Sequence, residues 1–301
     1  GLSEGCYDLL ASEARLTGFY AVAHGDVPAR HWRQLSRALV GRDGLRGLAS
    51  WTGTMFEYLM PELFLPLRRG SLLWESARFC LYVQRRDAPS GGPWGQSESG
   101  FFALDAALAY RYKAHGCAAL ALRRGMDEDR VFAPYAAYLA LAVAPDAAVR
   151  GLRRFAQIDP GGRYGLWEAV DFTPGRCAGG RGEVVRSVMA HHLGMSLAAA
   201  ANALLDGVMQ RRFMADPAMA AFAPLLAERA PEGAVLLRRR LARAHERAAR
   251  PEFGVASAEG ECGAGDARVF TLSNGVYGVQ CTDSGLFRSS AGGVSVHRGF
   301  E

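Results

Sequence analysis

Apolar positions in the first 230 residues recur mostly every three to four residues, which is the period of an amphipathic α-helix. Leu9, Leu16 and Tyr20 share one such face, so we predict a helix over residues 7–24. The same period, or an apolar run rich in Ala and Leu, predicts further helices over residues 72–84, 101–113, 135–144, 145–158, 187–205 and 209–216. The pattern therefore predicts an all-α region of roughly eight to ten helices, with functional residues on the connecting loops.

The pattern changes near the C-terminus. A stretch rich in Arg, Ala, Glu, Gly and Pro predicts a linker over residues 231–265. From Arg268 onward apolar and polar residues alternate, and Asn274-Gly275 between two alternating runs predicts a β-hairpin. We therefore expect a helical domain over residues 1–230, the linker, and the start of a β domain over residues 266–301.

One acidic residue, Glu98, lies at a predicted boundary between a loop and a helix. It belongs to the stretch PWGQSESGFF (93–102), which also holds Trp94 and two candidate helix N-caps, Ser97 and Ser99. A carboxylate at this place has two interpretations. It is a catalytic group on a loop that rigid elements hold in place, or a first-turn carboxylate that the helix dipole favours.

A second acidic residue, Glu13, lies on the apolar face of the predicted helix over residues 7–24. A carboxylate is expensive to bury unless it is paired or has a chemical task. We therefore expect Glu13 either to form an ion pair with Arg15 or Arg37, or to take part in the function.

Two further stretches are dense in aromatic and acidic residues. SWTGTMFEYLMP (50–61) and RYGLWEAVDFTP (163–174) contain Trp51, Glu57, Tyr58, Trp167 and Glu168. Aromatic faces next to carboxylates suit sugar rings, because the C–H face of a sugar stacks on an apolar plane. The alternative is that these aromatic residues belong to the ordinary core.

The adjacent residues His191 and His192 cannot both face solvent if this segment is a helix. A zinc-binding helix needs His at positions i and i+4, so we expect no metal here. A hydrogen bond to a sugar hydroxyl or to a buried carboxylate fits better. The six cysteines also lack metal-ligand spacing, which favours free thiols in a reducing compartment.

Several classes of function are disfavoured by composition. The net charge is +5, but the arginines are scattered, so no nucleic-acid face is expected. The longest apolar run, residues 187–205, contains His191 and His192 and therefore predicts a buried helix rather than a membrane span. No GxGxxG, P-loop, GxSxG or HExxH motif occurs. What remains is carboxylates and aromatic residues, which suit acid/base chemistry on a sugar.

Eight motifs in unbroken order carry a resemblance to a known family. They are YDLLASEARL (7–16), HGDVP with HW (24–32), SWTGTMFEYLMP (50–61), PWGQSESGF (93–101), APYAAYLAL (133–141), RYGLWEAVDFTP (163–174), VVRSVMAHHLGMSL (184–197) and LLDGVMQRRFMADP (204–217). Together they resemble the glycoamylase-like domain of cyclic β-1,2-glucan synthases. The last stretch, FTLSNGVYGVQCTDSG (270–285), resembles the opening strands of the glycoside phosphorylase domain that follows in those synthases.

This resemblance implies an (α/α)6 toroid that is incomplete at its N-terminus, followed by the first strands of a β-sandwich. It also implies a retaining transglycosylase that cleaves linear β-1,2-glucan and joins the chain to itself, releasing a ring. The resemblance further implies that Glu98 is the general acid/base and Glu13 is the nucleophile. The candidate substrate-binding residues are Trp51, Glu57, Tyr58, Trp94, Trp167, Glu168, His191 and His192, and no cofactor or metal is expected.

The resemblance also implies partners and a location. The substrate would be β-1,2-glucan, and the remainder of a larger synthase polypeptide would supply the glucosyltransferase and phosphorylase domains. The segment would lie on the cytoplasmic side of a bacterial inner membrane, as a fragment of a membrane-anchored synthase.

Two other functions stay open at this stage. Related endo-β-1,2-glucanases share the fold and use water as the acceptor, and a shortened domain could serve as a glucan-binding or spacer module. A retaining mechanism also needs an ionised nucleophile beside a protonated acid. A helix N-terminus at Glu98 would lower its pKa, so burial near Trp94 or the charge of Glu13 would have to outweigh the helix dipole.

Overall fold

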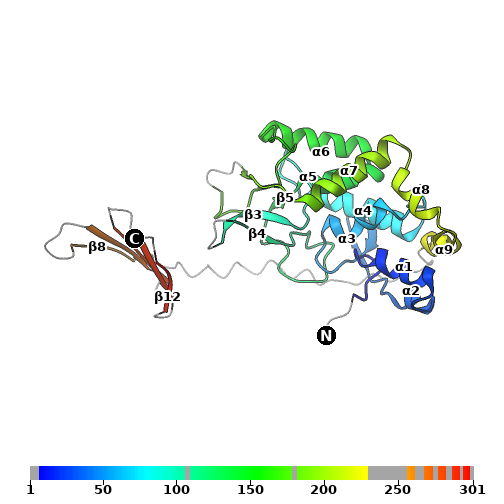
Figure 1. Cartoon of the computed structure of the whole chain (residues 1–301), viewed down its shortest axis with the longest axis horizontal. Coiled ribbons are helices and arrows are strands. Elements are labelled where there is room, and N and C mark those ends of the chain that lie inside the picture. Colours follow the sequence, from blue (N-terminus) through cyan, green and yellow to red (C-terminus); the bar gives the residue numbers. More distant parts are fainter. Residues whose placement is uncertain are drawn as a thin grey trace. The chain divides into compact units, whose positions relative to one another are not determined.

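The computed structural model describes residues 7–105, 109–177 and 182–229, together with five C-terminal strands (Figure 1). Main-chain contacts divide the chain into two compact units, Gly1–Arg238 and Arg239–Glu301. Within the described residues, the first unit is rich in helices and carries three small sheets, and the second is one antiparallel sheet.

The helices of the first unit's described part are mostly short. They are α1 (Arg15–His24), α2 (Arg30–Gln34), α3 (Met55–Leu59), α4 (Leu72–Asp87), α5 (Pro134–Leu139), α6 (Pro145–Ile158), α7 (Ala190–Leu204), α8 (Val208–Met214) and α9 (Pro217–Phe222), with the 3₁₀ segments η1 (Pro61–Leu63), η2 (Ala140–Ala142) and η4 (Ala223–Ala227). The predicted helices over residues 72–84 and 145–158 are confirmed by α4 and α6. Ser71 caps α4 by accepting a hydrogen bond from the Trp74 amide, and Pro145 opens α6.

Small sheets in the first unit correct the all-α expectation. Strands β1 (Leu39–Arg42) and β2 (Leu45–Leu48) pair, as do β3 (Ser99–Leu104) and β4 (Tyr110–Lys113), and a third sheet has the order β5 (Val131–Phe132), β6 (Ala169–Asp171), β7 (Glu183–Val185). All of these pairs are antiparallel.

The predicted helix over residues 101–113 is wrong, because this segment forms the β3–β4 hairpin. Ser99 pairs with Lys113 and Gly100 pairs with Tyr112. The segment is rich in aromatic residues, which favour strands, and hydrogen bonding across the hairpin outweighs an apolar spacing that also fits a helix. Glu98 therefore precedes a strand, and neither neighbouring serine caps a helix.

Two other helices differ from the predictions. Helix α1 begins at Arg15, so Glu13 lies in the turn before it rather than on its face. Helix α7 begins at Ala190 and is not the buried helix that we expected. Only His192 and Ala199 are buried along its length, whereas Leu197 and Leu204 are 72% and 82% exposed.

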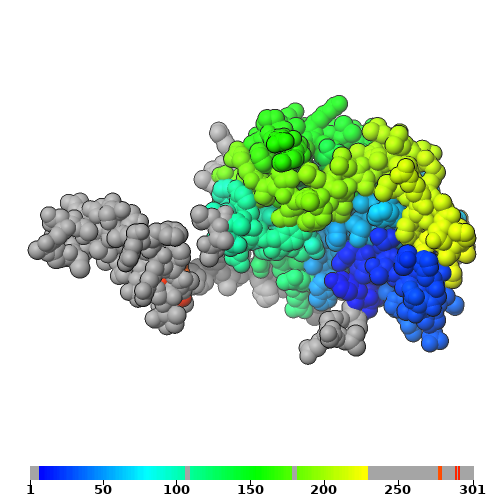
Figure 2. All heavy atoms as spheres, in the orientation of Figure 1, coloured from blue at the N-terminus to red at the C-terminus, as the bar shows by residue number. Residues whose placement is uncertain are grey.

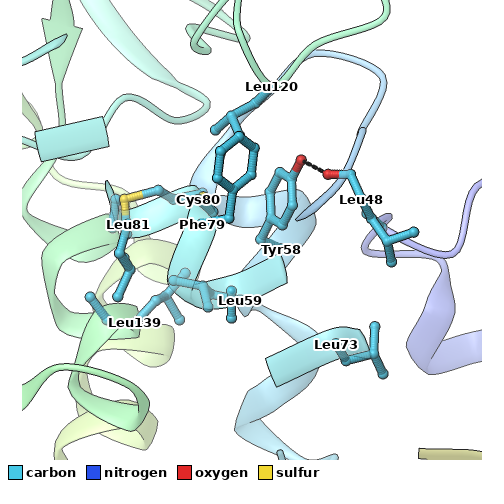
Figure 3. Packing of buried hydrophobic residues seen from close by; sticks show 14 of the residues in the cluster. Leu48, Tyr58, Leu59, Leu73, Phe79, Cys80, Leu81, Leu120 and Leu139 are labelled. Atoms are coloured by element: carbon cyan, nitrogen blue, oxygen red, sulfur yellow. Dashed lines mark hydrogen bonds between the residues drawn. The ribbon is translucent and has the colours of Figure 1, made fainter. Parts of the chain in front are cut away.

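Residues of α3, α4 and α5 form one part of the hydrophobic core (Figure 3). Leu59, Phe79, Leu81 and Leu139 pack there, each at most 4% exposed. Strand β2 packs directly against α4, where Leu48 donates its amide to the Ser76 hydroxyl at 3.0 Å.

Distant parts of the chain meet at the N-terminal helices. Helix α1 packs against α9, and the two lie side by side in the ribbon and the space-filling views, in blue and yellow (Figures 1 and 2). Arg37 strengthens this contact through a bidentate ion pair with Glu228, with distances of 2.7 and 2.8 Å. The beginning and the end of the helical unit are therefore joined.

The second unit contains β8 (Ala256–Glu261), β9 (Arg268–Ser273), β10 (Tyr277–Thr282), β11 (Phe287–Ala291) and β12 (Val294–Arg298), in the order β12-β11-β10-β9-β8. The predicted hairpin is confirmed by the β9–β10 pairing, although Asn274-Gly275 lies outside the described residues. Part of the stretch predicted as a linker, residues 256–261, is strand β8, which pairs with β9 along its full length. The β-sandwich stays a prediction.

Candidate active site

The loop that carries Glu98 is fixed by buried polar contacts. The side chain of Gln84, on α4, is fully buried and bonds the main chain of Gln96 twice. Its Oε1 accepts from the Gln96 amide at 2.7 Å, and its Nε2 donates to the Gln96 carbonyl at 3.0 Å. Gly95 has a φ of +119°, and its carbonyl accepts from the Ala133 amide at 2.9 Å. Rigid elements therefore set the position of Glu98.

Glu13 lies in the turn before α1 and is half-buried. The Ser12 hydroxyl donates to Glu13 Oε2 at 3.2 Å. The two arginines that could have neutralised Glu13 bind other carboxylates. Arg15 pairs with Glu62 at 2.7 Å, both side chains being almost completely buried, and Arg37 pairs with Glu228. The predicted ion pair of Glu13 with Arg15 or Arg37 is therefore wrong, and the Glu13 carboxylate remains available for a chemical role.

Burial raises the pKa of both candidate catalytic carboxyls. For Glu98 burial is the largest cause, and the negative charges of Glu13 and Glu57 raise its pKa further. For Glu13 burial is again the largest cause, and Glu57 adds to it, while Arg15 opposes it. Glu13 and Glu98 thus share one electrostatic neighbourhood although 85 positions separate them in the chain. The helix N-terminus expected at Glu98 is absent, since a strand follows this residue, so the pKa-lowering effect expected from that helix does not arise.

A tyrosine that sequence reasoning missed contacts Glu98. The hydroxyl of Tyr112, on β4, donates to Glu98 Oε2 at 3.4 Å, and this bond lowers the pKa of Glu98. The helix predicted over residues 101–113 gave no reason to place Tyr112 next to Glu98. Its position directly across the hairpin from Gly100 could have been found only by recognising the strand pairing.

A buried hydrogen-bonded pair, Glu168 and His192, contacts the main chain two residues after Glu98. His192 Nδ1 lies 2.9 Å from Glu168 Oε2, and the other oxygen of Glu168 accepts from the Gly100 amide at 3.1 Å. The His192 ring stacks on Tyr135, with 3.8 Å between centroids and 11° between planes. The prediction that one of the adjacent histidines faces the core is confirmed for His192, whereas His191 is exposed.

Three of the expected substrate-binding residues belong to the core instead. Glu57 is 5% exposed and accepts hydrogen bonds from five donors, four of them on Oε2. Tyr58 is 3% exposed and donates its hydroxyl to the Leu48 carbonyl (Figure 3). Trp94 is 6% exposed and packs its indole against Gly151 of α6. We therefore do not propose these three as sugar contacts.

The remaining aromatic candidates are accessible. Trp51 is 57% exposed on its loop. Trp167 donates its indole N–H to Asp159 at 2.9 Å and lines a cavity of about 420 Å³. Tyr135, Tyr164 and the Glu168–His192 pair also line this cavity. An apolar, aromatic cavity with a few buried polar groups is the usual form of a small-molecule site.

The described residues do not bring together three or more His, Cys, Asp or Glu side chains in a way that could hold a metal ion. In the same residues, no helix is long and apolar enough to cross a bilayer.

The family profile named Glycoamylase, which describes glucoamylase-like proteins, matches residues 6–217. The chain belongs to the Glycoamylase family. It is also 40% identical over 304 residues to the cyclic beta-(1,2)-glucan synthase NdvB of Rhizobium meliloti, an alignment that covers 99% of this chain and 11% of the synthase. The resemblance drawn from the sequence motifs is thereby confirmed.

Solved structures share the fold of this family member. An endo-beta-1,2-glucanase from Chitinophaga pinensis, in complex with sophorotriose and glucose, is 17% identical with a TM-score of 0.54. A glucoamylase-like protein from Bacteroides caccae is 19% identical with the same TM-score. Each match covers 72% of this chain, which spans about half (54%) of either relative. The complete toroid stays a prediction for this Glycoamylase chain.

Proposed function

We propose that this domain cleaves linear β-1,2-glucan and transfers the cleaved chain to its own end, giving a cyclic product with retained configuration. The observation that carries this proposal is the pair of half-buried carboxyls, Glu13 and Glu98, in one electrostatic neighbourhood. The raised pKa of Glu98, to which the negative charge of Glu13 contributes, suits an acid that must stay protonated beside a carboxylate. The 40% sequence identity to a cyclic beta-(1,2)-glucan synthase supports the choice of substrate.

The proposed reaction has two steps. Glu98 gives its proton to the glycosidic oxygen while the Glu13 carboxylate attacks the anomeric carbon, so that the C–O bond to the leaving chain breaks and a glycosyl ester forms on Glu13. Glu98, now ionised, then takes the proton from a 2-hydroxyl at the far end of the same glucan. That oxygen attacks the anomeric carbon, the ester breaks, and the ring is released.

A second candidate is hydrolysis of the same glucan, in which water replaces the sugar hydroxyl in the second step. This candidate is favoured by the fold shared with an endo-beta-1,2-glucanase. In either case we propose that the domain acts as part of a larger bacterial synthase polypeptide anchored in the inner membrane, on the cytoplasmic side.

The test is mass spectrometry of the products formed from linear β-1,2-glucan. Ring closure gives products lighter by one water than the matching linear glucans, whereas hydrolysis gives shorter linear chains. Glu98→Gln should abolish both and leave glucan binding intact. Binding without turnover by the unaltered chain would identify a glucan-binding module and contradict the proposal.

A further inference from the structure

The main chain around Glu98 is held from three sides. From α3, the amide of Phe56 donates to the Ser97 hydroxyl at 3.0 Å. From α5, the Tyr135 hydroxyl lies 2.7 Å from Ser97 Oγ and 2.9 Å from the carbonyl oxygen of Glu98 itself. A third contact, from Glu168, holds the amide of Gly100 two residues further on. The peptide that carries the candidate acid/base is thus fixed before, at and after Glu98.

Among these contacts, which all lie within the described residues, the hydrogen bond from Tyr135 is the one that reaches the main chain of Glu98 itself. The position of Tyr135 is fixed in turn by its own surroundings. The residue is 3% exposed, and its ring lies flat on the ring of His192. His192 is fixed in turn by Glu168, the same side chain that binds the Gly100 amide. The contacts therefore form a closed circuit from Glu98 through Tyr135, His192 and Glu168 back to the start of β3. Buried hydrogen bonds joined by a ring stack in this way restrict the motion of every member.

We propose that Tyr135 is a positioning residue for Glu98, and that the Glu168–His192 pair is its support. This proposal rests on the proposed function, in which Glu98 transfers a proton to the glycosidic oxygen. Tyr135 acts through the main chain and not on the reacting atoms. Its hydroxyl keeps the Glu98 peptide at a fixed distance from α5, and the carboxyl is thereby aligned with the leaving oxygen. Glu168 and His192, which we expected to contact sugar, have a supporting task in this proposal.

Loss of this alignment has a specific chemical consequence. Misplacement of a catalytic group by about 1 Å lowers a rate by about a hundredfold. A displaced Glu98 impairs proton donation, and proton donation matters only when the leaving group needs a proton. A glucan chain leaves as an alcohol and needs one, whereas fluoride leaves as an anion and does not. The two leaving groups therefore separate a positioning role from general damage to the fold.

The experiment compares Tyr135→Phe with the unaltered full chain on linear β-1,2-glucan and on a β-1,2-linked glucosyl fluoride. On the glucan we expect kcat to fall by about 10- to 100-fold while KM changes by less than about threefold. Single-turnover fluoride release, which reports only the first step, should fall by less than about threefold. The matched control is Tyr82→Phe, which removes a hydroxyl bound to Asp43 at the surface and should change neither rate.

Each outcome either supports or overturns the positioning role of Tyr135. Equal losses on both substrates would show that Tyr135 only maintains the fold, and unchanged kinetics would show that it has no role; either result overturns the inference. If the unaltered chain bound the glucan but acted on neither substrate, the proposed function itself would fail, which is a distinguishable result. Thermal melting checks folding, and if Tyr135→Phe does not fold, His192→Phe carries the same prediction, because it keeps a ring against Tyr135 and removes the contact with Glu168 that supports it.

Discussion

Replacement of Glu57 by alanine tests whether this buried carboxylate is structural or catalytic. In the structure its two oxygens accept hydrogen bonds from the hydroxyls of Ser50, Thr52 and Thr54 and from the amides of Thr52 and Thr54, at 2.7–3.0 Å. It also completes a capping box at the start of α3. Four of these donors meet Oε2 and the Thr52 amide meets Oε1, and the side chain is only 5% exposed, so the carboxylate is both occupied and shielded from a substrate.

The magnitude follows from the groups that Glu57→Ala leaves without an acceptor. The hydroxyls can rotate toward other partners, but the amides of Thr52 and Thr54 are fixed in the buried loop. A buried donor left unsatisfied costs about 1–3 kcal/mol. Two such amides give a loss of about 4 kcal/mol, which is a large part of the stability of an ordinary domain.

The assay is urea unfolding followed by tryptophan fluorescence. All five tryptophans lie between residues 32 and 167, so fluorescence reports on the first unit alone. The control is Glu75→Ala, which removes an exposed first-turn carboxylate of α4 and its surface ion pair with Arg78, and should cost less than about 0.5 kcal/mol. A loss for Glu57→Ala within about 1 kcal/mol of this control, together with abolished turnover, would refute the structural assignment and return Glu57 to the candidate substrate-binding residues.

Three further predictions concern the site and its support. Because burial and the charge of Glu13 raise the pKa of Glu98, ionisation of Glu98 destabilises the fold as the pH rises from the ordinary glutamate pKa of about 4.3 through the raised pKa; Glu98→Gln should therefore match the parent Tm at about pH 4 and exceed it at about pH 8. Tyr112→Phe removes a hydrogen bond that lowers this pKa, so the alkaline limb of kcat/KM should move to higher pH, and an unmoved limb would show that the contact is not made in solution. Gly151→Ala would place a methyl group 2.7 Å from the indole nitrogen of Trp94, and should lower the free energy of unfolding by about 1–3 kcal/mol in the same urea assay.

The carboxylates could be located from the sequence because they lie in distinctive local motifs. Glu98 and Glu13 stand in the SES and SEARL motifs, and their roles stay predictions. Their environments could not be predicted in the same way. Arg15 is only two residues from Glu13, but it pairs with Glu62, 47 residues further along the chain. Such a choice of partner depends on tertiary packing, which local spacing does not contain.

The segment after Glu98 shows where periodicity fails. The apolar residues of 101–113 have helical spacing, but the two arms of the hairpin satisfy each other's backbone groups. The same error concealed Tyr112. The contact of Tyr135 with Glu98 could not be predicted from the sequence either, because it joins a helix to a loop across 37 residues of chain. A local pattern predicted α4 and α6 correctly because their caps and apolar faces lie within the segment itself.

The central claim is that Glu13 and Glu98 act as nucleophile and acid/base. It is tested most directly by trapping the glycosyl ester on the Glu98→Gln variant with a β-1,2-linked glucosyl fluoride. This leaving group needs no proton, so the first step proceeds, whereas the second step lacks its base and the ester accumulates. Peptide mapping by mass spectrometry should find the sugar on the peptide that contains Glu13. Release of fluoride without a covalent adduct, or an adduct on another residue, would contradict the account.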